Sequence, residues 1–255
     1  QTCALPISRL PFEFARLSHR WLRRLRIHVV SYALPALIAI GQLLHLKRPT
    51  RNPLLRSLRN RSIGPTLRRL TAIQPSSGGF IEAVPLTAFV IMSLAAAGRP
   101  DHPVVTRGLE FLDGIARGNG AWPIDSNLAL WLTSLSINAL RAGPAADDVF
   151  LDASLDFLVC GQCRQIHPFT DAPPGGWPWT DLPGGVPDAD DTAGALLALA
   201  DAPADQSAEA ARTGLAWLLD LQNDDGGWPT FCRGWGKLPF DRSGGKAHAA
   251  AGGGG

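Results

Sequence analysis

The feature that most constrains the fold of this chain is a recurring unit, in which an apolar helical stretch leads into a glycine-rich turn. Each turn ends in an aromatic residue: Gly78-Gly79-Phe80, Gly120-Ala121-Trp122, Gly176-Trp177 and Gly226-Gly227-Trp228. Eleven residues separate Phe111 from Trp122, and eleven separate Trp217 from Trp228. Self-similarity at a period of about 40–60 residues is typical of helical repeats, whose helix pairs bury their apolar faces by stacking on one another.

Between these turns, apolar residues recur at helical spacing and the alternation typical of strands is scarce. The sequence therefore predicts an all-α fold. The expected helices span Phe12–Leu25, Tyr32–Leu46, Leu54–Ile73, Leu86–Ala97, Val104–Ala116, Asn127–Arg141, Val149–Cys163, Asp191–Ala200 and Ala208–Leu221. Twenty residues separate Phe157 from Trp177, so this copy of the unit carries a nine-residue insertion.

Two of the turns carry a fuller motif. Residues 222–228 have the pattern Q-x3-G-x-W, beginning at Gln222, and residues 74–80 repeat it from Gln74 with Phe80 in place of tryptophan. Glycine at 78 and at 226 permits a tight turn. We expect the glutamine amide to satisfy backbone groups left free at helix ends, and the aromatic ring to pack between neighbouring helices.

An acidic cluster lies at the predicted start of an apolar helix, where Asp188, Asp190 and Asp191 fall within four residues. Aspartate is favoured at such positions as a cap, which is one interpretation. A cap needs one acid, however, and the matching stretch of the preceding unit has Asp125 alone. Crowded carboxylates raise one another's pKa, so the cluster also predicts a carboxyl group that keeps its proton and serves as an acid.

Together these motifs resemble the squalene–hopene cyclases, which are class II terpene cyclases. The tandem turns resemble the QW motifs of that family, and residues 188–193 match its D-x-D-D-T-A motif. The resemblance as a whole extends from about Leu10 to His248. The resemblance implies an α/α barrel fold. Residues 9–120 would end a first barrel, with a basic part at 9–69, and residues 121–246 would begin the catalytic barrel, so each barrel is expected to be incomplete.

The resemblance also implies an activity and its residues. Asp190 would protonate a terminal alkene to start the cationic cyclisation of squalene to a hopanoid-like product, with Asp188 and Asp191 tuning it. A histidine in a T-A-H triplet assists the acid in the family, and His248 stands at a comparable place, with Lys246 where the family has threonine. Trp179 and Phe231 would line the substrate pocket, because aromatic faces stabilise carbocations. No cofactor and no metal are expected.

Charge is distributed unevenly. Residues 1–69 hold 14 Lys or Arg against one acid, Glu13, whereas residues 70–255 hold 10 basic and 21 acidic residues. A basic, apolar stretch favours an anionic partner, nucleic acid or membrane, although solvated arginines on amphipathic helices would give the same pattern. The resemblance favours the membrane, with monotopic attachment to the cytoplasmic face of a bacterial membrane, no nucleic acid and a possible homodimer.

Several alternatives stay open from the sequence. A class II diterpene cyclase also uses D-x-D-D, and a repeat scaffold without activity would use the acids as caps. The β subunit of protein prenyltransferases shares the α/α barrel but needs zinc, and the lone pair Cys160 and Cys163 lacks two further ligands. Residues 1–8 resemble a translated sequencing adapter and 247–255 are low-complexity Ala and Gly, so we expect a fragment that is inactive by itself.

Overall fold

The computed structural model describes residues 10–17, 33–143, 148–167 and 170–231. All regular elements among them are helical, which confirms the all-α prediction. In chain order they are η1 (Phe12–Arg16), α2 (Leu34–Lys47), α3 (Pro53–Ile73), η2 (Phe80–Glu82), α4 (Val84–Ala96), α5 (Pro103–Gly114), α6 (Ala129–Arg141), α7 (Asp148–Cys160), α8 (Ala189–Leu199) and α9 (Ala204–Leu221).

The first predicted helix, Phe12–Leu25, is wrong in the part that the structure describes. The chain makes a 3-10 helix that ends at Arg16, and Leu17 is already extended. The reason is a competing donor from α3, because the guanidinium of Arg69 donates to the main-chain carbonyls of Ala15 and Leu17. Those carbonyls therefore do not need the amides of a continuing helix. Residues 18–25 lie outside the described part of the chain.

The other predicted helices differ from the observed ones in where they begin. Two helices start at proline, α3 at Pro53 and α5 at Pro103, because the ring fixes a helical φ and its missing N–H has no partner in a first turn. The Asn52 side chain caps α3 by accepting from the amides of Leu54 and Leu55. Helix α8 begins two residues earlier than predicted, and α9 begins four residues earlier, at Ala204.

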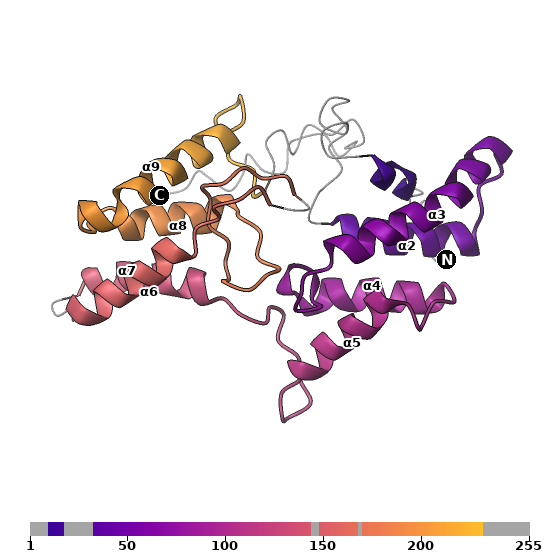
Figure 1. Cartoon of the computed structure of the whole chain (residues 1–255), viewed down its shortest axis with the longest axis horizontal. Helices are drawn as coiled ribbons and strands as arrows, with labels where there is room; N and C mark the ends of the chain where they lie inside the picture. The colour runs from indigo at the N-terminus through magenta and orange to yellow at the C-terminus, as the bar shows by residue number, and fades with distance from the viewer. Residues whose placement is uncertain (1–9, 18–32, 144–147, 168–169, 232–255) are drawn as a thin grey trace, which may run out of the picture.

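The helices form two groups, each with its own apolar core (Figure 1). One core joins α2, α3, α4 and α5 through fully buried side chains such as Ile38, Leu70 and Leu94. The other joins α6, α7, α8 and α9 around Leu130 and the ring of Trp177. The segment after α5 leads from one group to the other (Figure 1). The division near residue 120 into the end of one barrel and the start of another stays a prediction.

The glycine-rich turns are held by glutamine side chains. Gln74 Nε2 donates to the carbonyl of Gly78 at 2.9 Å and to that of Val104, in the first turn of α5, at 3.2 Å. Gly78 has φ +89°, and a Cβ there would lie 2.3 Å from the carbonyl oxygen of Arg107, so the turn requires glycine. The amide of Gln74 therefore ties this turn to the next helix.

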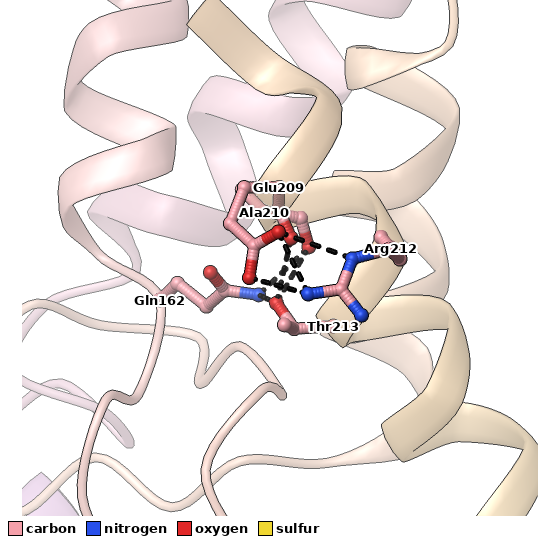
Figure 2. A network of polar contacts seen from close by, with 5 residues as sticks. All are labelled: Gln162, Glu209, Ala210, Arg212 and Thr213. Atoms are coloured by element: carbon pink, nitrogen blue, oxygen red, sulfur yellow. Dashed lines mark hydrogen bonds and ion pairs between the residues drawn. The ribbon is translucent and has the colours of Figure 1, made fainter.

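Gln162 makes the same clamp in the unit with the insertion, although the sequence analysis did not identify it. Its Nε2 donates to the carbonyls of Gly175, at 2.8 Å, and Ala210, at 2.9 Å. A third acceptor is Thr213 Oγ1 at 3.0 Å, and Figure 2 shows the amide of Gln162 beside Ala210 and Thr213. Gly175 has φ +124°, so it takes the part that Gly78 plays in the first unit.

The turn tryptophans repeat a second contact, between the indole N–H and the helix that precedes each turn. Nε1 of Trp122, Trp177 and Trp228 donates to a leucine carbonyl at 2.8, 2.7 and 2.8 Å, respectively. Burial differs, however, because Trp177 is fully buried whereas Trp122 and Trp228 are about half exposed. Packing of the ring between helices is thus complete at Trp177 among the three.

We expect Gln162→Leu to lower the free energy of unfolding by about 2–3 kcal/mol. The leucine has a similar volume but leaves the buried carbonyl of Gly175 without its donor, which costs about 1–3 kcal/mol, and removes one of the donors to Ala210. Gln222→Leu is the matched control, because Gln222 Nε2 donates to Gly226 in an exposed turn. Urea unfolding of both variants measures the difference, and an equal loss in the two would contradict the clamp.

Candidate functional site

The acidic cluster sits at the amino end of α8. Asp188 has extended backbone angles and is the N-cap residue, and its Oδ1 accepts from the amide of Asp191 at 2.8 Å. The helix begins at Ala189, so Asp190 and Asp191 both lie within its first turn. Asp188 is therefore a helix cap, as the simpler interpretation of the sequence held, while the other two acids are more than a cap requires.

Burial separates the three acids. Asp188 is 4 % exposed and Asp191 is 8 % exposed, whereas Asp190 is exposed. Burial is the main cause that raises the pKa of Asp188, to about 9, and a hydrogen bond from its carboxyl group to that of Asp191 and the negative charge of Asp191 raise it further. Burial also raises the pKa of Asp191, and the charge of Asp190 adds to this effect. Asp188 thus holds a proton near neutral pH and shares it with Asp191.

Burial therefore raises the pKa of Asp188 and of Asp191, whereas the resemblance singles out Asp190 as the proton donor. Crowding among the acids was expected to keep a proton in the cluster, and burial adds to that effect by raising the pKa of Asp188 and of Asp191. Asp190 projects from the side of α8 that the described residues leave uncovered, together with Leu197, which is also exposed. The assignment of proton transfer to Asp190, with Asp188 and Asp191 as its tuning partners, stays a prediction.

Two backbone hydrogen bonds bring an aromatic pair beside the acids. The amide of Asp188 donates to the carbonyl of Trp177 at 3.1 Å, and the amide of Ala189 donates to that of Thr230 at 2.9 Å. The residues that follow these acceptors closely, Trp179 and Phe231, meet edge to face with ring centroids 6.3 Å apart. Both residues proposed from the sequence to contact substrate are thus placed together, next to the acid motif.

Trp131 is a further aromatic at this end of the domain that the sequence analysis missed. Its backbone amide donates to the carbonyl of Trp179 at 3.2 Å, and its side chain is 42 % exposed at the start of α6. The available signal was a tryptophan near the start of an apolar predicted helix. Gln162 had a signal too, because it follows Phe157 by the same five residues that separate Trp217 from Gln222.

The remaining predictions concern His248 and the metal. His248 lies outside the described part of the chain. In the described ranges no group of three or more His, Cys, Asp or Glu side chains is arranged to hold a metal ion. Cys160 is exposed and Cys163 is partly buried. Burial and the charge of Asp188 raise the pKa of the Cys163 thiol to about 11, so this thiol is protonated near neutral pH.

Comparison with known proteins finds a similarity that covers these residues. Residues 127–238, which contain the acid motif and both members of the aromatic pair, match the squalene–hopene cyclase C-terminal domain. The resemblance to the squalene–hopene cyclase family is thus confirmed. The cyclase domain match begins just before α6, so the acids, Trp131 and the Gln162 clamp all fall within it.

Individual relatives agree with this assignment. The chain is 29% identical to sporulenol synthase of Bacillus subtilis over 153 residues, which cover 57% of the chain and 24% of that relative. It is 28% identical to the squalene–hopene cyclase of Alicyclobacillus acidocaldarius over 171 residues, 62% of the chain and 27% of the relative. A probable squalene–hopene cyclase of Sinorhizobium fredii is 28% identical over 190 residues, 69% of the chain and 29% of the relative. The chain therefore spans less than a third of the length of each of these cyclases.

The helices that the structure describes include none long and apolar enough to cross a membrane.

The buried acids give a pH-dependent stability of definite sign. Because the pKa of Asp188 is raised to about 9 in the folded state, the folded chain binds its proton over the range from about pH 4 to pH 9 while the unfolded chain releases it. Stability from this group therefore falls as the pH rises through that window. We expect a lower thermal midpoint at pH 8 than at pH 5, and a smaller difference in Asp188→Asn, which keeps a neutral cap. An unchanged difference in the variant would contradict the protonated Asp188.

Proposed function

We propose that this chain is part of a triterpene cyclase of the squalene–hopene type, which protonates a terminal alkene through Asp190 and cyclises squalene to a hopanoid-like product. The observation that carries the proposal is the acid motif at the amino end of α8, where a buried acid pair lies beside an exposed third acid and an aromatic pair. A structural cap would need Asp188 alone.

In the proposed first step, the O–H bond of protonated Asp190 breaks as the alkene π electrons take the proton. A new C–H bond forms at the terminal carbon, a tertiary carbocation remains at the neighbouring carbon, and Asp190 becomes a carboxylate. The cluster as a whole resists loss of a proton, because burial raises the pKa of Asp188 and of Asp191.

The aromatic residues then support the cations that follow. A strong base beside a carbocation would remove a proton from it and end the reaction. The face of an aromatic ring instead stabilises the positive charge, by about 0.5–2 kcal/mol per ring. The rings of Trp179 and Phe231 meet beside the acid motif. Trp131 lies next to this pair, because its backbone amide donates to the carbonyl of Trp179. Aromatic side chains of this kind suit an apolar polyene, and the proposed reaction requires that water, which would quench a cation, is kept away from them.

The full-length protein that carries this chain should be incubated separately with squalene and with geranylgeranyl diphosphate, and the products identified by mass spectrometry. Cyclic triterpenes from squalene support the proposal. Products from the diphosphate alone would instead assign the protein to the class II diterpene cyclases. No product from either substrate, with the fold intact, would favour a scaffold in which the acids act as helix caps.

A further inference from the structure

A buried carboxylate outside the acid motif joins the two helical groups. Glu82, at the end of η2, is fully buried, and the described residues supply it with hydroxyl and amide donors. Its Oε1 accepts from Ser77 Oγ at 2.6 Å and from the amide of Gly184 at 2.9 Å, and its Oε2 accepts from Ser126 Oγ at 3.3 Å. One side chain thus connects three segments that lie far apart in the sequence.

The backbone around Glu82 is strained. Ile81 has φ +49° and Glu82 has φ +54°, both in the left-handed region that residues with a Cβ avoid. The main chain is held there by further contacts, because the carbonyl of Glu82 accepts from the amide of Ser126 at 3.0 Å and Val84 donates to Ile124 at 2.9 Å. Strain of this kind persists where the surroundings fix it, and it often marks a site with a function.

The contact with Gly184 is the informative one, because Gly184 lies four residues before Asp188. This approach segment, residues 182–187, is held at successive points. Glu82 accepts from Gly184, His167 Nε2 donates to the carbonyl of Gly185 at 3.1 Å, and Asp188 donates to Trp177. Gly184 has no room for a side chain, since a Cβ would lie 2.7 Å from Glu82 Oε1. The position of the acid motif therefore depends on the carboxylate from the first helical group.

We propose that Glu82 is a positioning residue, which through Gly184 fixes the approach segment and so holds the acid cluster in its reactive place. The inference rests on the proposed cyclase function. Glu82 touches neither the reacting carbon nor the acids, and it acts by geometry, where a displacement of about 1 Å can cost about a hundredfold in rate.

The test compares variants of the full-length protein with squalene as substrate. Glu82→Ala should lower kcat by about 10–100-fold and change KM by less than about threefold, the range seen when a supporting contact of a site is removed. Glu82→Gln should restore kcat to within about threefold of the parent. Its amide oxygen can still accept from Gly184, and its NH2 group can donate to Ser126 Oγ.

Two further variants separate positioning from general stability. Gly184→Ala displaces the carboxylate from the other side and should reproduce the kcat loss, even if Glu82→Ala does not fold. Ser126→Ala is the matched control, because it removes a hydrogen bond to Glu82 but leaves Gly184 in place, and it should keep the parent kcat. Equal losses in Glu82→Gln and Glu82→Ala, or in Ser126→Ala and Gly184→Ala, would overturn the inference.

If the parent protein makes no cyclic product, the proposed function fails while the contact itself can still be tested. Hydrogen exchange should then show a protected Gly184 amide in the parent and an amide that exchanges at least about tenfold faster in Glu82→Ala. An amide that exchanges equally fast in both proteins would show that Glu82 does not hold the segment.

Discussion

Asp190→Asn is expected to abolish cyclisation of squalene in the full-length protein, with turnover lower by about 10²–10⁴-fold or more. The amide of asparagine has no acidic proton to transfer, and it fills the same space. Because Asp190 is exposed, the free energy of unfolding should change by less than about 1 kcal/mol. Product formation measured by gas chromatography, alongside a thermal unfolding curve, checks both parts of this expectation.

Asp201→Asn provides the control for that experiment. Asp201 is also exposed, and it lies just beyond the opposite end of α8 from the acid motif. The change in charge and size is the same, so this variant should cyclise squalene at the rate of the parent. An Asp190→Asn protein that retains activity would remove Asp190 from the mechanism and direct attention to the protonated pair of Asp188 and Asp191.

Trp177→Ala is expected to have the largest effect on stability, a loss of about 3–5 kcal/mol in the free energy of unfolding. The ring is fully buried in the core of α6–α9, and its N–H donates to the carbonyl of Leu158 at 2.7 Å. It lies so close to Gly214 that a Cβ there would approach the ring to 2.4 Å. Truncation therefore opens a cavity and removes the shorter of two hydrogen bonds to the carbonyl of Leu158, which urea unfolding would measure.

Trp122→Ala tests whether burial or the indole hydrogen bond carries that effect. Trp122 makes the same contact, to the carbonyl of Leu112 at 2.8 Å, but its side chain is 53 % exposed. We expect a loss of about 1 kcal/mol, because water can replace the hydrogen bond and little cavity forms. A loss in Trp122→Ala as large as in Trp177→Ala would show that the hydrogen bond, and not the core, dominates.

The fold could be predicted from the sequence because its signals are local. Helical periodicity, prolines in first turns and glycines at tight turns each act over a few residues, so the helices appear where they were expected. The prediction of the first helix was wrong for a non-local reason. Arg69, more than fifty residues away, takes the carbonyls of Ala15 and Leu17 and ends the first helix early.

The candidate site divides in the same way. The three acids and the pair Trp179 and Phe231 could be chosen from motif spacing, and the structure places them side by side. Which acid is buried could not be predicted, because exposure in the first turn of α8 depends on what the turns and α9 cover. The role of Glu82 could not be predicted from the sequence. Its partners Gly184 and Ser126 are distant in the sequence and become its neighbours only in the folded chain.

The contact between Glu82 and Gly184 has a consequence for how such sequences can change. Each helical group packs around its own core, so substitutions within one group are free to accumulate with little effect on the other. The carboxylate and the glycine belong to different groups and leave each other no spare room. Homologous proteins should therefore replace these two residues together, and a side chain at 184 should accompany a shorter residue at 82.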